Sequence, residues 1–155
     1  MSAMHRAYIR REAAISAVIN MAIAAGFFLV LFGGQTTVNL WGANGLVVDS
    51  LPQGFMVGLF SVVPASLILR MRLGKGLIQT SGEIRSSLPR SFIGRALLLA
   101  TLSMLGLVLT ASALAWLSGQ VAISFYFGLA LKMLASALIS MIITPMALRA
   151  MLSAK

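Results

Sequence analysis

The feature that most constrains the fold is the run ALLLATLSMLGLVLTASALAWLS, residues 96–118, which contains no charged side chain. A helix on the surface of a soluble protein carries a polar stripe along one side. This run has only serine and threonine hydroxyls from which such a stripe could be built. About 20 apolar residues are enough for a helix to cross the hydrocarbon core of a bilayer. We therefore expect residues 96–118 to form a transmembrane helix.

Three further apolar runs of similar length occupy residues 13–32, 51–69 and 123–148. Only 10% of the residues are charged, whereas a soluble domain has about 25%. The basic start followed by the first run resembles a signal peptide, but the length of the run suits a retained first span. The sequence thus predicts an all-α membrane protein with one domain, residues 1–155, whose four transmembrane helices form two helical hairpins.

The basic residues are distributed unevenly between the segments that connect these runs. Eleven of the twelve lie near the N-terminus, in a linker of about 74–87 with its flanks, or near the C-terminus: Arg6, Arg10, Arg11, Arg70, Arg72, Lys75, Arg85, Arg90, Arg95, Arg149 and Lys155. The loops 33–50 and 119–122 contain none. Because positively charged loops stay in the cytoplasm, we expect a multi-pass protein of the bacterial inner membrane with both termini cytoplasmic. The expected partners are the bilayer, anionic lipid headgroups on the cytoplasmic face and other membrane helices, and no nucleic acid.

A short phrase occurs twice, as DSLPQGF before the second apolar run and as SSLPRSF before the third. Ser50 and Ser87 suit the N-cap position of a helix, where a hydroxyl accepts a bond from a free backbone N–H. Pro52 and Pro89 would then fall in the first turn, where a missing N–H costs little. The phrase predicts two helix starts. Each half also ends with a proline shortly before an arginine, which suggests a parallel internal duplication.

Reactive groups are scarce in this chain. It has no cysteine, one histidine (His5) and three acidic residues (Glu12, Asp49 and Glu83). Thiolate chemistry and disulfides are therefore excluded. The remaining groups are scattered along the sequence, whereas acid–base or nucleophilic chemistry needs partners within hydrogen-bonding reach. We expect no enzyme activity, no cofactor and no catalytic or metal-binding residues.

The candidate site consists of polar residues within or at the edge of the apolar runs, since such residues are functional candidates in a membrane. They are Asn20, Asp49, Lys132, Ser136, Ser140 and Thr144. Lys132 and Asp49 are both expected near the outer face, where they either form an ion pair between the hairpins or are solvated separately. From Lys132 to Thr144 the polar residues recur every four positions, which indicates either a packing seam or the wall of a polar pathway. Asn20 is expected to form an interhelical hydrogen bond or to contact a ligand.

The run INMAIAAGFF…FGGQTTVNLWGANGLVVDSLPQGF, residues 19–55, resembles a pattern in small uncharacterised bacterial four-helix membrane proteins that are described as permease-like. The resemblance implies a four-helix membrane fold and assigns no active-site residue.

Two functions follow from these observations as hypotheses. The first is a non-enzymatic accessory or assembly subunit of a membrane complex, favoured by the short loops and the small-residue helix faces. The alternative is a homo-oligomeric small-molecule transporter, favoured by the size of the chain and the two similar hairpins. A proton-coupled exporter would need a titratable group near the middle of the membrane, and the first span offers Asn20 there.

Overall fold

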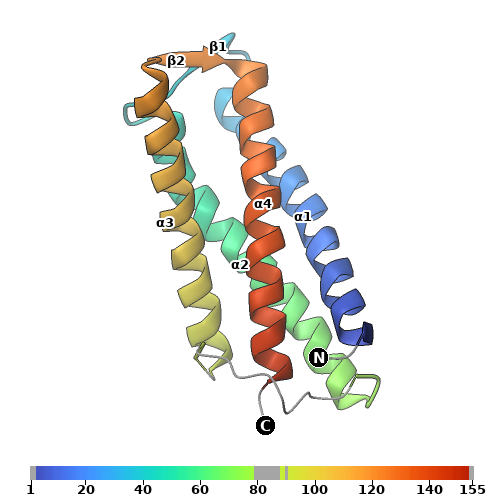
Figure 1. Ribbon diagram of the computed structural model, residues 1–155. Coiled ribbons are helices and arrows are strands. Elements are labelled where there is room, and N and C mark those ends of the chain that lie inside the picture. The colour runs from blue at the N-terminus through green and yellow to red at the C-terminus, as the bar shows by residue number, and fades with distance from the viewer. Residues whose placement is uncertain (1–2, 79–87, 90, 154–155) are drawn as a thin grey trace.

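The computed structural model describes residues 3–78, 88–89 and 91–153 of the chain. Across these residues it contains four long helices and two short strands (Figure 1). In chain order they are α1 (Ala3–Phe32), β1 (Thr37–Asn39), α2 (Leu46–Gly74), α3 (Phe92–Ser118), β2 (Ala122–Ser124) and α4 (Phe125–Leu152). All four helices are long and apolar enough to span a membrane. The prediction of four helices with the length and composition of membrane spans is confirmed.

The helices run alternately up and down, so that both connecting strands lie at one end of the bundle. The start of α1, the ends of α2 and α4 and the start of α3 lie at the opposite end (Figure 1). β1 and β2 pair antiparallel, with Val38 opposite Ile123 at the centre of the register. Val38 is fully buried, so this small sheet closes one end of the bundle. The strands were not predicted, because three-residue segments carry no detectable alternation.

The most extensive helix contacts lie between the two predicted hairpins and not within them. α1 packs mainly on α4, and α2 packs mainly on α3, whereas α1 with α2 and α3 with α4 have few contacts. Figure 1 shows α2 crossing behind α4, which it also contacts, from the side of α3 to the side of α1.

Two glycines set the close approach between α2 and α3. A Cβ atom at Gly54 would lie 2.7 Å from the Cα atom of Met104, and one at Gly58 would lie 2.5 Å from the Cα atom of Ala100. Real Cβ atoms do not approach so closely, so a larger residue at either position would push the helices apart. The predicted role of small residues in membrane helix packing therefore applies to this contact.

The observed helices are longer than the apolar runs from which they were predicted. α1 starts at Ala3 rather than at residue 13, and α2 extends to Gly74 rather than to residue 69. A helix satisfies its own backbone groups and can continue beyond the hydrocarbon, and arginine is a good helix former. The predicted linker of about 74–87 falls largely on residues 79–87, which lie outside the described residues.

The two helix starts predicted from the repeated phrase are wrong. α2 begins at Leu46 after Gly45, so Ser50 and Pro52 lie inside the helix, and the Ser50 hydroxyl donates to the Leu46 carbonyl at 2.7 Å. The N-cap of α3 is Ser91, whose hydroxyl accepts from the Gly94 N–H at 3.3 Å, and Pro89 precedes it. Ser87 lies outside the described residues. An acidic side chain in the first turn also stabilises a helix start, and Asp49 occupies that turn of α2.

Apolar clusters fill both ends of the bundle. One cluster lies at the strand end around Phe28, Phe32 and Val38. The other lies at the opposite end around Tyr8, Leu69 and Leu148. Between these ends, α1, α2 and α4 place buried polar side chains toward one another.

Candidate functional site

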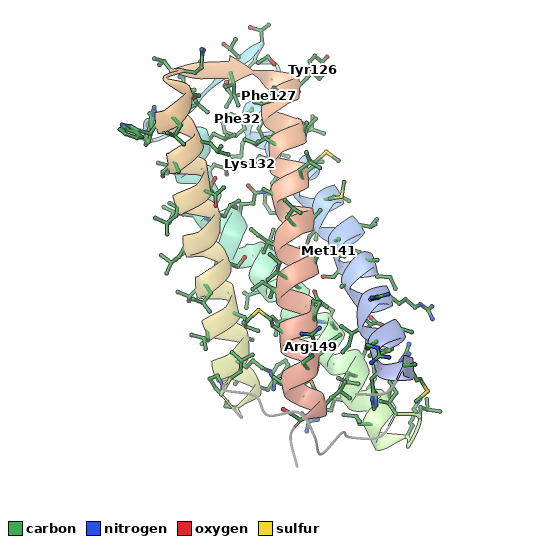
Figure 2. All side chains as sticks on the ribbon, viewed as in Figure 1. Phe32, Tyr126, Phe127, Lys132, Met141 and Arg149 are labelled. Atoms are coloured by element: carbon green, nitrogen blue, oxygen red, sulfur yellow. The ribbon has the colours of Figure 1, made fainter. Side chains whose placement is uncertain are left out.

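The candidate site starts near the strand end with an ion pair between α2 and α4. Lys132 Nζ lies 2.6 Å from Asp49 Oδ2 and 3.3 Å from Ser50 Oγ. The Lys132 side chain is 4% exposed and the Asp49 side chain is 17% exposed. Figure 2 shows Lys132 in the half of α4 nearer the strands and Arg149 near the opposite end. Of the two alternatives for these residues, the structure contains the ion pair, and Lys132 does not extend into solvent.

One turn further along both helices, Gln53 Nε2 donates to Ser136 Oγ at 2.9 Å. The other heteroatom of this amide, Gln53 Oε1, is buried and has no hydrogen-bond partner among the described residues. Gln53 was not among the predicted site residues. Its position four residues after Asp49 was a signal that could have identified it, because residues at this spacing share a helix face.

The deepest part of the site is a junction of three helices around Asn20. Asn20 Nδ2 donates to Ser140 Oγ of α4 at 2.9 Å, to Ser61 Oγ of α2 at 3.1 Å and to the Ser16 carbonyl at 3.0 Å. The Ser61 hydroxyl in turn donates to Ser140 Oγ at 3.1 Å. Thr144 Oγ1 donates to the Ser61 carbonyl at 3.2 Å. Asn20, Ser61, Ser140 and Thr144 have no exposed surface, so this junction is sealed from the surroundings.

These contacts lie along one row, which we call the polar ladder. Its members are Asp49, Gln53 and Ser61 of α2, Lys132, Ser136, Ser140 and Thr144 of α4, and Asn20 of α1. Three of the contacts join residues that are 83 positions apart. α2 and α4 both run from the strand end to the opposite end, so side chains at intervals of four stay in register along the two helices (Figure 1).

All six predicted candidates lie in the polar ladder. The prediction missed that Ser61 and Gln53 supply the partners on α2. Both lie in the row that starts at Asp49 and advances by four residues. Ser61 was not among the predicted site residues, because a serine in an apolar run can be either a small packing residue or a hydrogen-bond partner.

The chemistry available in the polar ladder is limited to hydrogen bonding and one ion pair. Its carboxylate and its ammonium group neutralise each other, and its other members are amides and hydroxyls. Among residues 3–78, 88–89 and 91–153, no three His, Asp or Glu side chains gather as a metal site would require. The arrangement is suited to joining helices with directional bonds.

Two hollows border the bundle near the polar ladder. A crevice of about 220 Å³ lies between α1 and α2, with Asp49 and Gln53 among its lining residues. It adjoins a wider depression of about 570 Å³ at the strand end, with which it shares Leu31, Asp49 and Pro52.

A third hollow lies toward the opposite end of the bundle, between α1 and α4. This groove of about 190 Å³ is lined by Arg6, Arg10 and Arg149 together with Ile9, Ala13, Met141 and Pro145. No acidic residue is among its lining residues.

Comparisons of the chain with models of protein families, with curated proteins and with solved structures give no match.

Proposed function

We propose that this protein is a non-enzymatic accessory or assembly subunit of a membrane complex in the bacterial inner membrane. The observation that carries the proposal is the burial of the polar ladder. Ser136, Ser140, Thr144 and Asn20 have no exposed surface, and each bonds to another side chain or to the backbone of this chain. Polar groups used in this way hold helices together and are not available to a passing solute.

The outer surface of α3 is suited to contact with another membrane helix. α3 is the least buried of the four helices. On its exposed side, Gly106 has open space where a Cβ atom would stand, and Thr110 and Ala113 are exposed nearby. The Thr110 hydroxyl donates to the Gly106 carbonyl at 2.7 Å, so it needs no partner from outside. Small residues on a lipid-facing side allow a second helix to approach closely.

Purification in mild detergent tests this proposal when it is combined with a matched pair of substitutions. Gly106→Leu fills the exposed side of α3, whereas Gly26→Leu makes the same change on α1, where a Cβ atom also meets nothing. We expect the unmodified protein and the Gly26→Leu variant to purify with other membrane proteins, and the Gly106→Leu variant to lose them. A pure homodimer, or equal recovery of partners with both variants, would contradict a subunit role.

The alternative function is a homo-oligomeric small-molecule transporter, in keeping with the resemblance to permease-like proteins. The crevice beside Asp49 supports it, because it brings a hollow to the outer end of the polar ladder. Transport would require a path past the sealed junction at Asn20. A homo-oligomer that moves a solute across proteoliposomes, with loss of this activity in a variant of Asn20, would support transport and not the subunit role.

We also infer that the two halves of the chain are an internal duplication related by an approximate two-fold axis along the bundle. Such an axis exchanges α1 with α3 and α2 with α4, so it converts the α1–α4 contact into the α2–α3 contact, and these two contacts are the most extensive. It also explains why β1 and β2 pair antiparallel around Val38 and Ile123. Homologous sequences test the inference, since the halves should align at an offset of about 83–85 in most of them.

For the topology, we propose that the termini and the α2–α3 connection are cytoplasmic. The natural chain has no cysteine, so single cysteines can be labelled without background. We expect Asn44→Cys to react with an impermeant thiol reagent in cells whose inner membrane is intact, and Lys75→Cys to react only after permeabilisation. The reverse pattern would overturn the orientation.

The groove between α1 and α4 supports the proposed contact with anionic lipid headgroups. Arg6, Arg10 and Arg149 border it at the end where the termini lie, and Ile9 and Met141 offer an apolar surface beside them. A phosphodiester with acyl chains matches this combination. We expect the double variant Arg10→Gln/Arg149→Gln to retain less phosphatidylglycerol in native mass spectrometry, and Arg70→Gln, an exposed arginine outside the groove, to retain it.

A further inference from the structure

The crevice between α1 and α2 has apolar walls, and one of its lining residues, Gln53, carries a buried polar atom without a hydrogen-bond partner. Ile23, Phe27 and Phe28 of α1 face Met56 and Val57 of α2 across it. Its volume of about 220 Å³ exceeds the roughly 150 Å³ of an engineered apolar cavity that accepts benzene. The crevice is therefore large enough for an aromatic ring or a short alkyl chain.

The polar atom is supplied by Gln53, which lines the crevice. Its Nε2 is engaged by Ser136, whereas its Oε1 is buried without a partner among the described residues. A buried acceptor without a hydrogen bond is costly, and native proteins usually satisfy such atoms with protein, water or a ligand. Asp49 lies one turn away on the same wall, with its Oδ2 bonded to Lys132.

The crevice is also accessible from the strand end of the bundle. The wider depression of about 570 Å³ shares Leu31, Asp49 and Pro52 with it, and it includes the polar residues Gln35 and Asn44. A molecule with an apolar part in the crevice could thus keep a polar part near Gln53 and Asp49, at the edge of the wider depression.

We propose that this crevice binds a neutral amphipathic molecule that carries a hydroxyl group on an alkyl or aromatic body. The Gln53 amide turns so that its buried Oε1 reaches the crevice and accepts a hydrogen bond from the hydroxyl, and the apolar body lies between Phe27 and Met56. A cationic head would compete with Lys132 for Asp49, and an anionic head would face the carboxylate of Asp49 and the oxygen of Gln53. A neutral donor avoids both costs. The proposal is independent of the subunit role.

Photolabelling of the full chain in lipid nanodiscs tests the proposal. The probe is an octanol that carries a photoactivatable diazirine on its chain, and labelled residues are located by mass spectrometry. We expect labels to concentrate in 23–31 and 52–57, and octanol to remove them at about one fifth of the concentration at which octane does so. Competition by octane equal to that by octanol would overturn the role of the hydroxyl group.

Two substitutions examine the two parts of the site separately. Gln53→Leu removes the acceptor, and we expect apparent affinity for the probe to fall about fivefold, the factor that corresponds to one neutral hydrogen bond. Ile23→Trp fills the crevice and should abolish the concentrated labelling. Val30→Trp, which changes an 83% exposed residue of the same helix outside the crevice, should leave it intact.

Folding of every variant is measured by size-exclusion chromatography and circular dichroism, so that a loss of the binding site is distinguished from misfolding. If Gln53→Leu fails to fold, the comparison of Ile23→Trp with Val30→Trp still tests the crevice. Unchanged labelling in Ile23→Trp, or labels spread evenly over the lipid-facing side chains, would show that the probe merely partitions into the bilayer and would overturn the proposal.

Discussion

The two faces of α2 join their neighbours by different physical means. The face toward α4 carries Asp49, Gln53 and Ser61, and each bonds to a side chain of α4. The face toward α3 carries Gly54 and Gly58, which let the two backbones approach too closely for a Cβ atom to fit between them. One helix is thus held on one side by directional bonds and on the other by close packing.

This difference shows how a short membrane chain can specify both register and proximity. Lipid tails are as apolar as leucine, so burial of apolar side chains alone does not drive helices together in a bilayer. Hydrogen bonds and ion pairs select which residues meet, whereas glycine contacts select how near the helix axes lie. Ser103 combines a directional bond with close packing, because its hydroxyl donates to the Gly54 carbonyl at 2.7 Å across the glycine contact.

The largest effect is expected when the ion pair of the polar ladder is broken. Lys132→Met leaves Asp49 without its cation at a site where the pair is mostly buried, and removal of one partner of a buried pair costs about 3 kcal/mol. The free energy of unfolding, measured by SDS titration in mixed micelles, should fall by that amount. Adding Asp49→Asn should restore at least half of the loss. Equal stability of Lys132→Met and the unmodified protein would mean that the pair does not hold α2 on α4.

The glycine contact should show the next largest effect. Gly58→Val places a branched side chain against the backbone of Ala100, and overpacking of this kind costs about 2 kcal/mol. Gly106→Val, on the exposed side of α3, is the matched control and should change unfolding much less, because a side chain there meets open space. Similar losses for both variants would show that general helix propensity, and not the close approach, is responsible.

The three-helix junction is expected to contribute less than either contact. Asn20→Ala removes the donor that joins α1 to Ser61 and Ser140, and interhelical hydrogen bonds in membranes are worth about 0.6 to 1.7 kcal/mol. We expect the free energy of unfolding to fall by about 1 kcal/mol. Asn44→Ala, in the exposed loop at the strand end, should leave it unchanged. A loss as large as that of Lys132→Met would contradict this order and show that the Asn20 junction contributes as much to folding stability as the ion pair does.

The smallest effect is expected at the end of α2 that contacts α1. Arg72 lies 4.0 Å from Glu12 Oε1 and 5.0 Å from the ring centroid of Tyr8. Since the Arg72 side chain is 37% exposed, the pair is screened and should be worth about 0.5 kcal/mol. Arg72→Gln should lower the free energy of unfolding by about this amount in dilute buffer, and high salt should reduce the difference. A larger effect that salt does not change would indicate a packing role for the Arg72 stem.

The sequence predicted the spans and the residues of the candidate site better than it predicted their partners. The four apolar runs correspond to the four helices, since about 20 apolar residues can satisfy their backbone only as a helix in lipid. The starts of α2 and α3 were wrong, because a serine two residues before a proline fits a cap and also fits the second turn of a helix or the segment before one.

The residue pairs were harder to predict for a different reason. A periodicity of four positions shows that Lys132, Ser136 and Ser140 share one face of a helix, but it does not show which helix that face meets. Asp49–Lys132 was identified as one of two alternatives because only one acidic residue was expected near the outer end. Gln53 and Ser61 carry no charge, and no such property separated them from the other polar residues of the chain.

By itself, the sequence determined that this chain forms four apolar helices and which of their faces carry polar or small residues, because these properties follow from composition and from the period of the helix. Only the tertiary structure decided that α2 packs on both α3 and α4, that α1 packs mainly on α4, and that a crevice remains beside Gln53. Those outcomes depend on contacts between residues that are far apart in the chain, and such contacts follow from the fit of whole helix surfaces and not from any local pattern.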